Sequence, residues 1–205
     1  HVMRDARLMA SAGINAVRTY TAILDLSVLD VLWHHGIMVV QTVAWSPSVS
    51  DDQVAAAVMA TRCHPAIAAW LLFNEPNYAG DYSEAAVVSR ARTLARLVKS
   101  LDSTGRPVAL CWGEVPPASV YDALLPEIDA WGLNVYRGRG FTDLFAQWHA
   151  LSTKPLFISE YGADSWSVVL NRPDEATQAL EVSGLARALT ARAASEGAAG
   201  GGVGG

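Results

Sequence analysis

Short apolar runs and longer amphipathic segments alternate along the 205-residue chain. Runs rich in Val, Ile and Trp have the length and composition of strands that are buried on both faces. Six such runs occupy residues 14–20, 37–45, 67–75, 107–113, 128–136 and 155–162. The intervening segments 26–35, 51–63 and 84–102 place apolar residues three and four positions apart, which predicts helices. This order predicts repeated βα units around a parallel sheet.

Residues at the predicted boundaries support the same division. Asp51 or Asp52 offers a cap for the helix that follows the second strand. Gly13, Gly36 and Gly105 each come just after a helical segment and just before a strand, where a left-handed residue commonly ends a helix. The glycine-rich residues 197–205 predict either the beginning of a further strand or a flexible tail.

Two architectures accommodate alternating βα units: an open doubly wound sheet and a closed (β/α)8 TIM barrel. No predicted strand is followed by a GxGxxG or GxxxxGK[ST] phosphate loop, which favours the barrel. Polar and aromatic residues gather instead at the carboxyl ends of successive strands, the face on which barrel enzymes build their sites; they are Arg18, Tyr20, Trp45, Asn74, Glu75, Trp112, Asn134, Tyr136 and Glu160. We therefore expect one α/β domain over residues 1–205.

Composition excludes several classes of function. A chain with 51% hydrophobic and 17% charged residues can bury a substantial core. The formal net charge is -5 and basic residues do not cluster, so nucleic acid is not an expected partner. No apolar stretch reaches the roughly 18 residues that a membrane span needs. Cys63 and Cys111 lack metal-ligand spacing and are expected to be buried thiols, so no metal or cofactor is predicted. Compartment and oligomeric state stay open.

Two strand-end carboxylates carry the chemistry. Glu75 ends the run IAAWLLFNE and Glu160 ends FISE, about three βα units apart, so the two can face each other across a barrel. Retaining glycoside hydrolysis needs such a pair, about 5 to 5.5 Å apart. Glu75, which follows an apolar strand, is expected to donate and accept a proton, and Glu160, held by hydrogen bonds, to stay ionised as the nucleophile.

Plainer structural roles compete with some of these assignments. Each glutamate could cap the following helix or pair with an arginine, although that is less expected of both together. Trp45 and Trp112, at strand ends, are the tryptophans favoured to bind substrate by stacking on sugar rings, with a place in the core as the alternative. Trp148 lies in a helical stretch and is expected to pack. Glu114 is expected to be a solvated loop carboxylate.

Four motifs carry a resemblance to a known group of enzymes. The segments GINAVRTY, HPAIAAWLLFNEP, WGLNVYRG and KPLFISEYGAD resemble successive strand motifs of clan A retaining glycoside hydrolases. The likeness is strongest to the barrel domain of family 2 enzymes such as β-galactosidases and β-glucuronidases, and it spans about residues 5–166.

The resemblance implies roles for particular residues. It implies that Glu75 is the acid/base, that Glu160 is the nucleophile and that Asn74 contacts the sugar 2-hydroxyl. It further implies that Arg18 braces the nucleophile and that Tyr136 donates a hydrogen bond to it. The implied substrate is an oligosaccharide or polysaccharide, which a retaining β-glycosidase cleaves by double displacement.

Two alternative functions use the same residues. YRGRGFTDLFAQW followed by KPLFISEYGAD is also similar to β-1,3-glucanosyltransferases of the same clan, which pass the covalent glucosyl group to another sugar. A carbohydrate-binding barrel that keeps the pair without turnover is the other alternative.

The chain departs from the family pattern at both ends. If residues 14–20 form the second barrel strand, the first strand is missing. The eighth strand would have to come from residues 197–205, which lack the usual eighth-strand tryptophan. The expected barrel is therefore incomplete.

Overall fold

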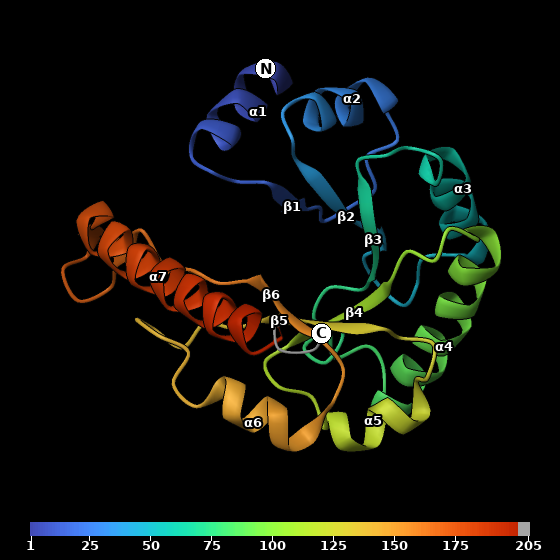
Figure 1. The fold of residues 1–205 in the computed structure, drawn as a ribbon. Helices are drawn as coiled ribbons and strands as arrows, with labels where there is room; N and C mark the ends of the chain where they lie inside the picture. The colour runs from blue at the N-terminus through green and yellow to red at the C-terminus, as the bar shows by residue number, and fades with distance from the viewer. Residues whose placement is uncertain (201–205) are drawn as a thin grey trace.

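The computed structural model describes residues 1–200, with side chains described for residues 1–193. Six parallel strands form one curved sheet in the order β1-β2-β3-β4-β5-β6. Figure 1 shows the sheet curving through a large part of a barrel, with helices on its outer side. The strands are β1 (Ala16–Arg18), β2 (Met38–Ala44), β3 (Ile67–Leu72), β4 (Val108–Gly113), β5 (Ala130–Asn134) and β6 (Leu156–Glu160). The predicted partial TIM barrel is confirmed.

Helices connect consecutive strands of the sheet; they are α2 (Leu26–His34), α3 (Asp51–Thr61), α4 (Glu84–Leu101), α5 (Ala118–Leu124) and α6 (Leu144–Leu151). Helix α1 (Val2–Ser11) precedes β1, and α7 (Glu175–Gly200) follows the last strand. Gly13, Gly36 and Gly105 have φ values of 82°, 72° and 81°, as predicted for left-handed residues between helix and strand. The cap predicted for α3 was wrong. Ser50 is the N-cap, because its hydroxyl accepts from the Gln53 amide while the Gln53 side chain accepts from Ser50 N–H.

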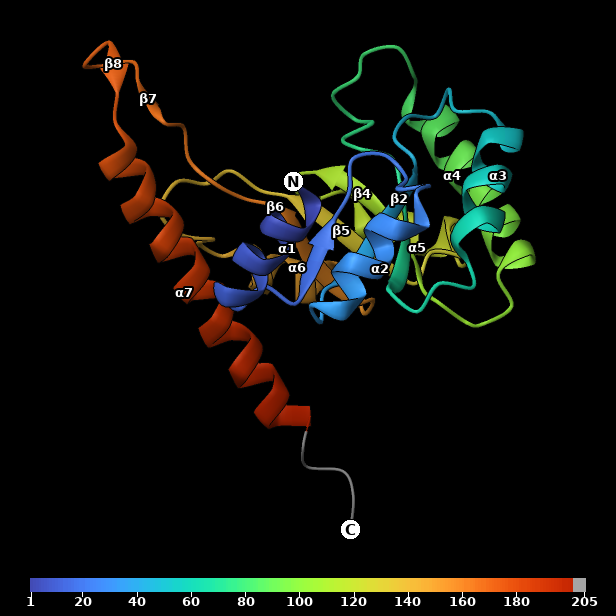
Figure 2. The same ribbon diagram turned by 90° about the horizontal axis from the view of Figure 1, so that it is seen from above.

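The carboxyl-terminal segment contains elements that the apolar pattern did not predict. After β6 the chain forms a short antiparallel hairpin from β7 (Trp166–Ser167) and β8 (Arg172–Pro173), then enters α7. Figure 2 shows α7 along one side of the sheet. Residues 197–200, expected to begin a strand or a tail, instead belong to α7, and residues 201–205 lie outside the described part of the chain.

Alternation along the strands separates two apolar layers. Inside the curve, Leu71, Ala109 and Cys111 form a small cluster. The neighbouring strand residues point outward into the larger core between sheet and helices, which includes Leu72, Leu110, Trp112, Trp131 and Trp148. Buried Cys111 fits its expected role, but Cys63, just beyond α3, is exposed and the prediction of a second buried thiol was wrong.

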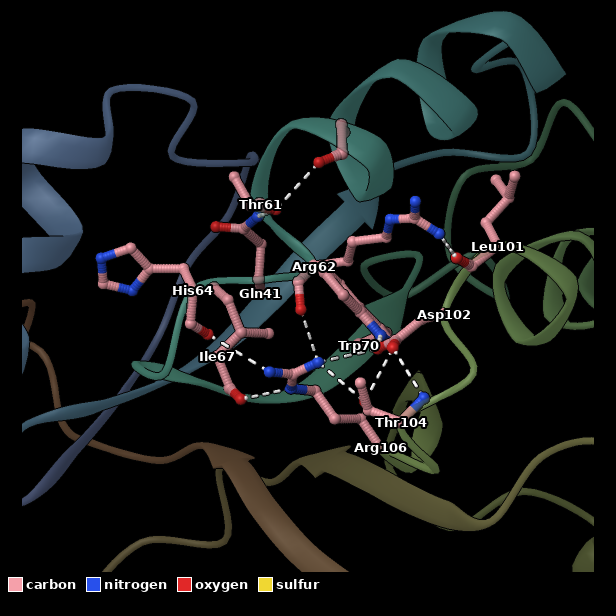
Figure 3. A network of polar contacts seen from close by, with 11 residues as sticks. Gln41, Thr61, Arg62, His64, Ile67, Trp70, Leu101, Asp102, Thr104 and Arg106 are labelled. Atoms are coloured by element: carbon pink, nitrogen blue, oxygen red, sulfur yellow. Dashed lines mark hydrogen bonds and ion pairs between the residues drawn. The ribbon is translucent and has the colours of Figure 1, made fainter.

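A polar network ties β3 to β4 at the amino-terminal end of the sheet (Figure 3). The Arg106 guanidinium donates to the backbone carbonyls of Ile67 and Arg62, each at 2.7 Å, and pairs with Asp102 at 3.1 Å. Asp102 also accepts from the indole N–H of the fully buried Trp70 at 2.8 Å. Contacts at this end of a barrel serve stability, because barrel enzymes build their sites at the opposite face.

Asp102 makes the stability of the domain depend on acidic pH. Desolvation opposes ionisation, but hydrogen bonds from Thr104, Trp70 and Arg106 outweigh it and lower the pKa of Asp102 from 3.8 to about 2. The contribution of Asp102 to the free energy of unfolding is therefore present above pH 3.8 and is lost as the pH falls toward 2. The pKa shift corresponds to about 2 kcal/mol of stability.

Asp102→Asn should lower the free energy of unfolding at pH 7 and flatten the pH dependence of that free energy below pH 4. Urea denaturation at several pH values tests this, with Asp81→Asn, which removes an exposed carboxylate, as the control. The prediction is contradicted if the free energy of unfolding changes with pH below pH 4 equally in the two variants.

Candidate active site

Glu160 reaches the inside of the sheet because of an irregularity in strand pairing. Leu133 pairs with Ile158, but the next residue, Asn134, pairs with Glu160, so Ser159 is an extra residue in β6. Strict alternation would point Ser159 and Glu160 to opposite faces, and a bulge of this kind turns both toward the same side. The Ser159 hydroxyl donates to Asn134 Oδ1 at 2.6 Å, while the Glu160 carboxylate lies over the strand ends.

Both carboxylate oxygens of Glu160 accept hydrogen bonds. Arg18, at the end of β1, donates from Nη1 to Oε1 and forms an ion pair with it. Tyr136, just beyond β5, donates its hydroxyl to Oε2 at 3.0 Å. The side chain of Arg18 is only 12% exposed, so its geometry is fixed by its surroundings. Glu160 is thus held from two sides, with its charge partly compensated.

Glu75 leaves β3 through a sharply bent segment. Phe73 and Glu75 have φ values of 65° and 46°, which few non-glycine residues adopt and which are typical of functional sites. Backbone N–H groups of Phe73 and Asn74 donate to the carbonyls of Ala44 and Trp45, so β2 supports the bend. The bend presents Asn74 and Glu75 toward the inside of the strand ends.

Asn134 connects the two halves of the site. Its Oδ1 accepts from Ser159 and from the Cys111 thiol at 3.3 Å, so its amide nitrogen must point the other way. That Nδ2 donates to Glu75 Oε1 at 3.0 Å and lies 3.3 Å from Asn74 Oδ1. Asn74 Oδ1 also accepts from Arg18 Nη2 at 2.6 Å. A continuous network therefore runs from Glu160 through Arg18 and Asn74 to Asn134 and Glu75.

The negative charges of Glu160 and Glu75 both act on the phenol of Tyr136. Desolvation, the hydrogen bond to Glu160 and the negative charges of Glu160 and Glu75 raise the pKa of Tyr136, while Arg18 opposes the rise. Tyr136 therefore stays a hydrogen-bond donor over the neutral range. Its sensitivity to both charges agrees with the placement of Glu75 and Glu160 in one site.

The two tryptophans predicted at strand ends have different environments. Trp45 follows β2 and is 41% exposed beside the bend that carries Asn74, so it is still available to a ligand. Trp112 is 3% exposed and packs edge-on against Tyr121 and Trp131, with ring centroids 5.5 and 6.3 Å away. The predicted contact of Trp112 with a sugar was wrong, because Cys111 points inward and its neighbour in the strand must point outward.

An ion pair between Glu114 and Arg137 joins two loops at the strand ends. Glu114 follows β4 with φ 63° and accepts two hydrogen bonds from Arg137, at 2.9 and 2.6 Å. As expected, Glu114 is a loop carboxylate that is partly solvated, with 38% of its side chain exposed. The ion pair with Arg137, on the loop after β5, was not expected. An open pocket of about 520 Å³ extends from Tyr136 to Asp164, Gln178 and Glu181 at the start of α7.

Asn134 is the main residue of the network to which sequence reasoning gave no function. It stood among the strand-end polar residues, but its link to Glu75 depends on Cys111 and Ser159, which come from two other strands. The signal was its burial in an apolar run: an amide that is 3% exposed must find partners.

Fold and site together define a class. A parallel barrel that gathers paired glutamates, an arginine, two asparagines and a tyrosine at its strand ends has the layout of a TIM-barrel catalytic domain. The family model described as "Glycosyl hydrolases family 2, TIM barrel domain" matches residues 43–179, more than half of the chain. The chain belongs to this family, which confirms the resemblance found in the sequence.

Several solved structures are similar in fold. A Bacteroides uniformis β-glucuronidase has a TM-score of 0.68 and 22% identity, over 89% of this chain and 25% of its own. A GH2 β-galacturonidase from Eisenbergiella tayi, solved with galacturonate, has a TM-score of 0.67 and 20% identity, over 91% and 37%. A Ruminococcus gnavus β-glucuronidase, solved with D-glucuronic acid, has a TM-score of 0.67 and 18% identity, and the match covers 93% of this chain and 36% of its own. The chain thus spans well under half the length of these proteins.

The search of curated proteins matches none to this sequence. Among the helices of the described residues, none combines the length and apolar character needed to cross a membrane.

Proposed function

We propose that this domain carries the catalytic pair of a retaining β-glycosidase, with Glu160 as nucleophile and Glu75 as acid/base. The observation that supports the proposal most is the single hydrogen-bonded network that contains both glutamates at the strand ends. If the two glutamates were only helix caps or members of isolated ion pairs, Asn74 and Asn134 would not need to connect them. The proposed substrate is an oligosaccharide or polysaccharide with a β-linked sugar.

Different partners suit the two glutamates to different roles. Glu160 accepts from a guanidinium and a phenol, which orient a carboxylate for attack on an anomeric carbon. Glu75 accepts from the neutral amide of Asn134, a contact that leaves a carboxyl free to exchange a proton.

The proposed reaction has two balanced steps. In the first, Glu160 forms a bond to the anomeric carbon as the bond to the leaving oxygen breaks, and Glu75 gives that oxygen a proton. In the second, Glu75 takes a proton from water, the water oxygen bonds to the anomeric carbon, and Glu160 leaves as a carboxylate. The sugar is inverted twice and keeps its β configuration.

Covalent trapping tests the proposal. The whole protein should be screened with a panel of 4-nitrophenyl β-glycosides, and the sugar that is hydrolysed should then be supplied as its 2-deoxy-2-fluoro glycosyl fluoride. One sugar should remain attached, and peptide mapping should place it on Glu160, within LFISEYG. NMR of the hydrolysis should show the β-anomer first, and a crystal structure should place the carboxyls about 5 to 5.5 Å apart. No hydrolysis across the panel, a label elsewhere, or an α-anomer formed first would contradict the proposal.

A further inference from the structure

The loop between β3 and α4 is fixed to the end of β4. The Asn77 side chain accepts from Gly113 N–H and donates to the Gly113 carbonyl, both at 2.9 Å. Within the loop, Tyr78 N–H donates to the Glu75 carbonyl at 3.0 Å, which closes a tight turn. Tyr78 is therefore held at a set position relative to Glu75.

The Tyr78 ring rests on a residue that has no side chain. A Cβ at Gly113 would lie 2.2 Å from Tyr78 Cε2, so only glycine lets the ring approach the strand this closely. Gly113 pairs with Asn134 across β4 and β5, and Asn134 donates to Glu75. The ring thus lies over the strand ends beside the proposed acid/base.

Most of the Tyr78 side chain is nevertheless open. It is 65% exposed, although its edge is packed on Gly113. One side of the ring is fixed on the backbone, so the side chain has already lost much of its conformational freedom. A ligand that binds the accessible surface therefore loses little further side-chain entropy. Such rings suit ligands whose own rings present flat C–H surfaces.

We propose that Tyr78 forms the leaving-group subsite and stacks on the sugar ring that Glu75 protonates. The proposal rests on the proposed function, because the acid/base donates its proton to the leaving oxygen and the leaving group therefore lies on the Glu75 side. Trp112, the aromatic residue expected at the end of β4, is buried, whereas Tyr78 presents a ring over that same strand end.

Substrates with and without a ring in the leaving group separate binding from chemistry. The measurement is the ratio of kcat/KM for a β-linked disaccharide to kcat/KM for the β-glycosyl fluoride of the same sugar, because fluoride is too small to reach Tyr78. Tyr78→Ala should lower this ratio about tenfold, and Tyr78→Phe should keep it within about twofold of the parent, because the ring remains. Trp33→Ala, which removes an exposed aromatic from the outer helix α2, serves as the matched control and should keep the parent ratio.

Gly113→Ala provides a second variant that leaves Tyr78 in the sequence. Its added Cβ should displace the ring and lower the same ratio. An unchanged ratio in Tyr78→Ala would overturn the proposal, and so would an equal loss on both substrates, which would indicate a role in folding the loop. A parent protein that turns over neither substrate would instead contradict the proposed function.

Discussion

Glu160→Gln is expected to lower turnover by several orders of magnitude for every substrate, whatever its leaving group. An amide cannot attack the anomeric carbon, so the covalent glycosyl-enzyme cannot form. Glutamine keeps the size of the side chain, and its carbonyl oxygen can still accept from Arg18 or Tyr136. The loss should therefore appear in kcat rather than in KM alone, as expected when an interaction of the transition state is removed.

The matched control is Glu114→Gln, which also alters a strand-end carboxylate that an arginine holds. Because Glu114 lies outside the network that joins Glu75 and Glu160, its activity should fall far less than that of Glu160→Gln. Steady-state kinetics on an aryl glycoside and a disaccharide, with circular dichroism to verify folding, compare the two variants. A Glu160→Gln protein that retains a tenth of the parent activity would exclude Glu160 as the nucleophile.

The strand framework could be predicted because the strands of a parallel barrel form apolar runs that are separated by longer amphipathic helical segments. Each of the six predicted runs contains a strand of the sheet, from Ala16–Arg18 to Leu156–Glu160. The hairpin β7–β8 could not be predicted in the same way, since two-residue strands bury too little apolar surface to leave a pattern. The Ser50 cap was overlooked because two acidic residues follow it directly.

The sequence indicated which side chains lie together where the carboxyl end of a strand determines their position. Glu75, Glu160, Arg18, Asn74 and Tyr136 meet because carboxyl ends of parallel strands converge on one face. Their individual roles are still predictions.

Prediction failed where the alternation of side chains along a strand, or a contact between distant segments, decides which way a side chain points. Trp112 was assigned to the site although Cys111, its neighbour, takes the inward position. Strict alternation would also have pointed Glu160 and Ser159 to opposite faces of the sheet, and only the bulge opposite Asn134 turns both to the same side. The Glu114–Arg137 pair joins two loops, and no local pattern encodes that contact.

Glu75→Gln should separate the two chemical steps that Glu160→Gln abolishes together. Glutamine cannot donate a proton, which matters for a sugar alkoxide leaving group but little for an activated phenolate such as 2,4-dinitrophenolate. Formation of the glycosyl-enzyme from a dinitrophenyl glycoside should therefore survive, while its hydrolysis slows because no base activates water. The expected kinetics are a burst of phenolate followed by a slow steady state, with little turnover of a disaccharide.

Azide then distinguishes the two glutamates, because this anion needs no general base to attack the glycosyl-enzyme. Added azide should restore steady-state turnover of the dinitrophenyl glycoside by Glu75→Gln and yield a β-glycosyl azide, since the sugar is again inverted twice. Asn134 should still orient the glutamine through its Nδ2 donor, so the variant should remain folded. NMR of the azide product gives the configuration at the anomeric carbon. If azide instead rescues Glu160→Gln and produces an α-glycosyl azide, while Glu75→Gln does not respond, the nucleophile is Glu75 and the two roles are reversed.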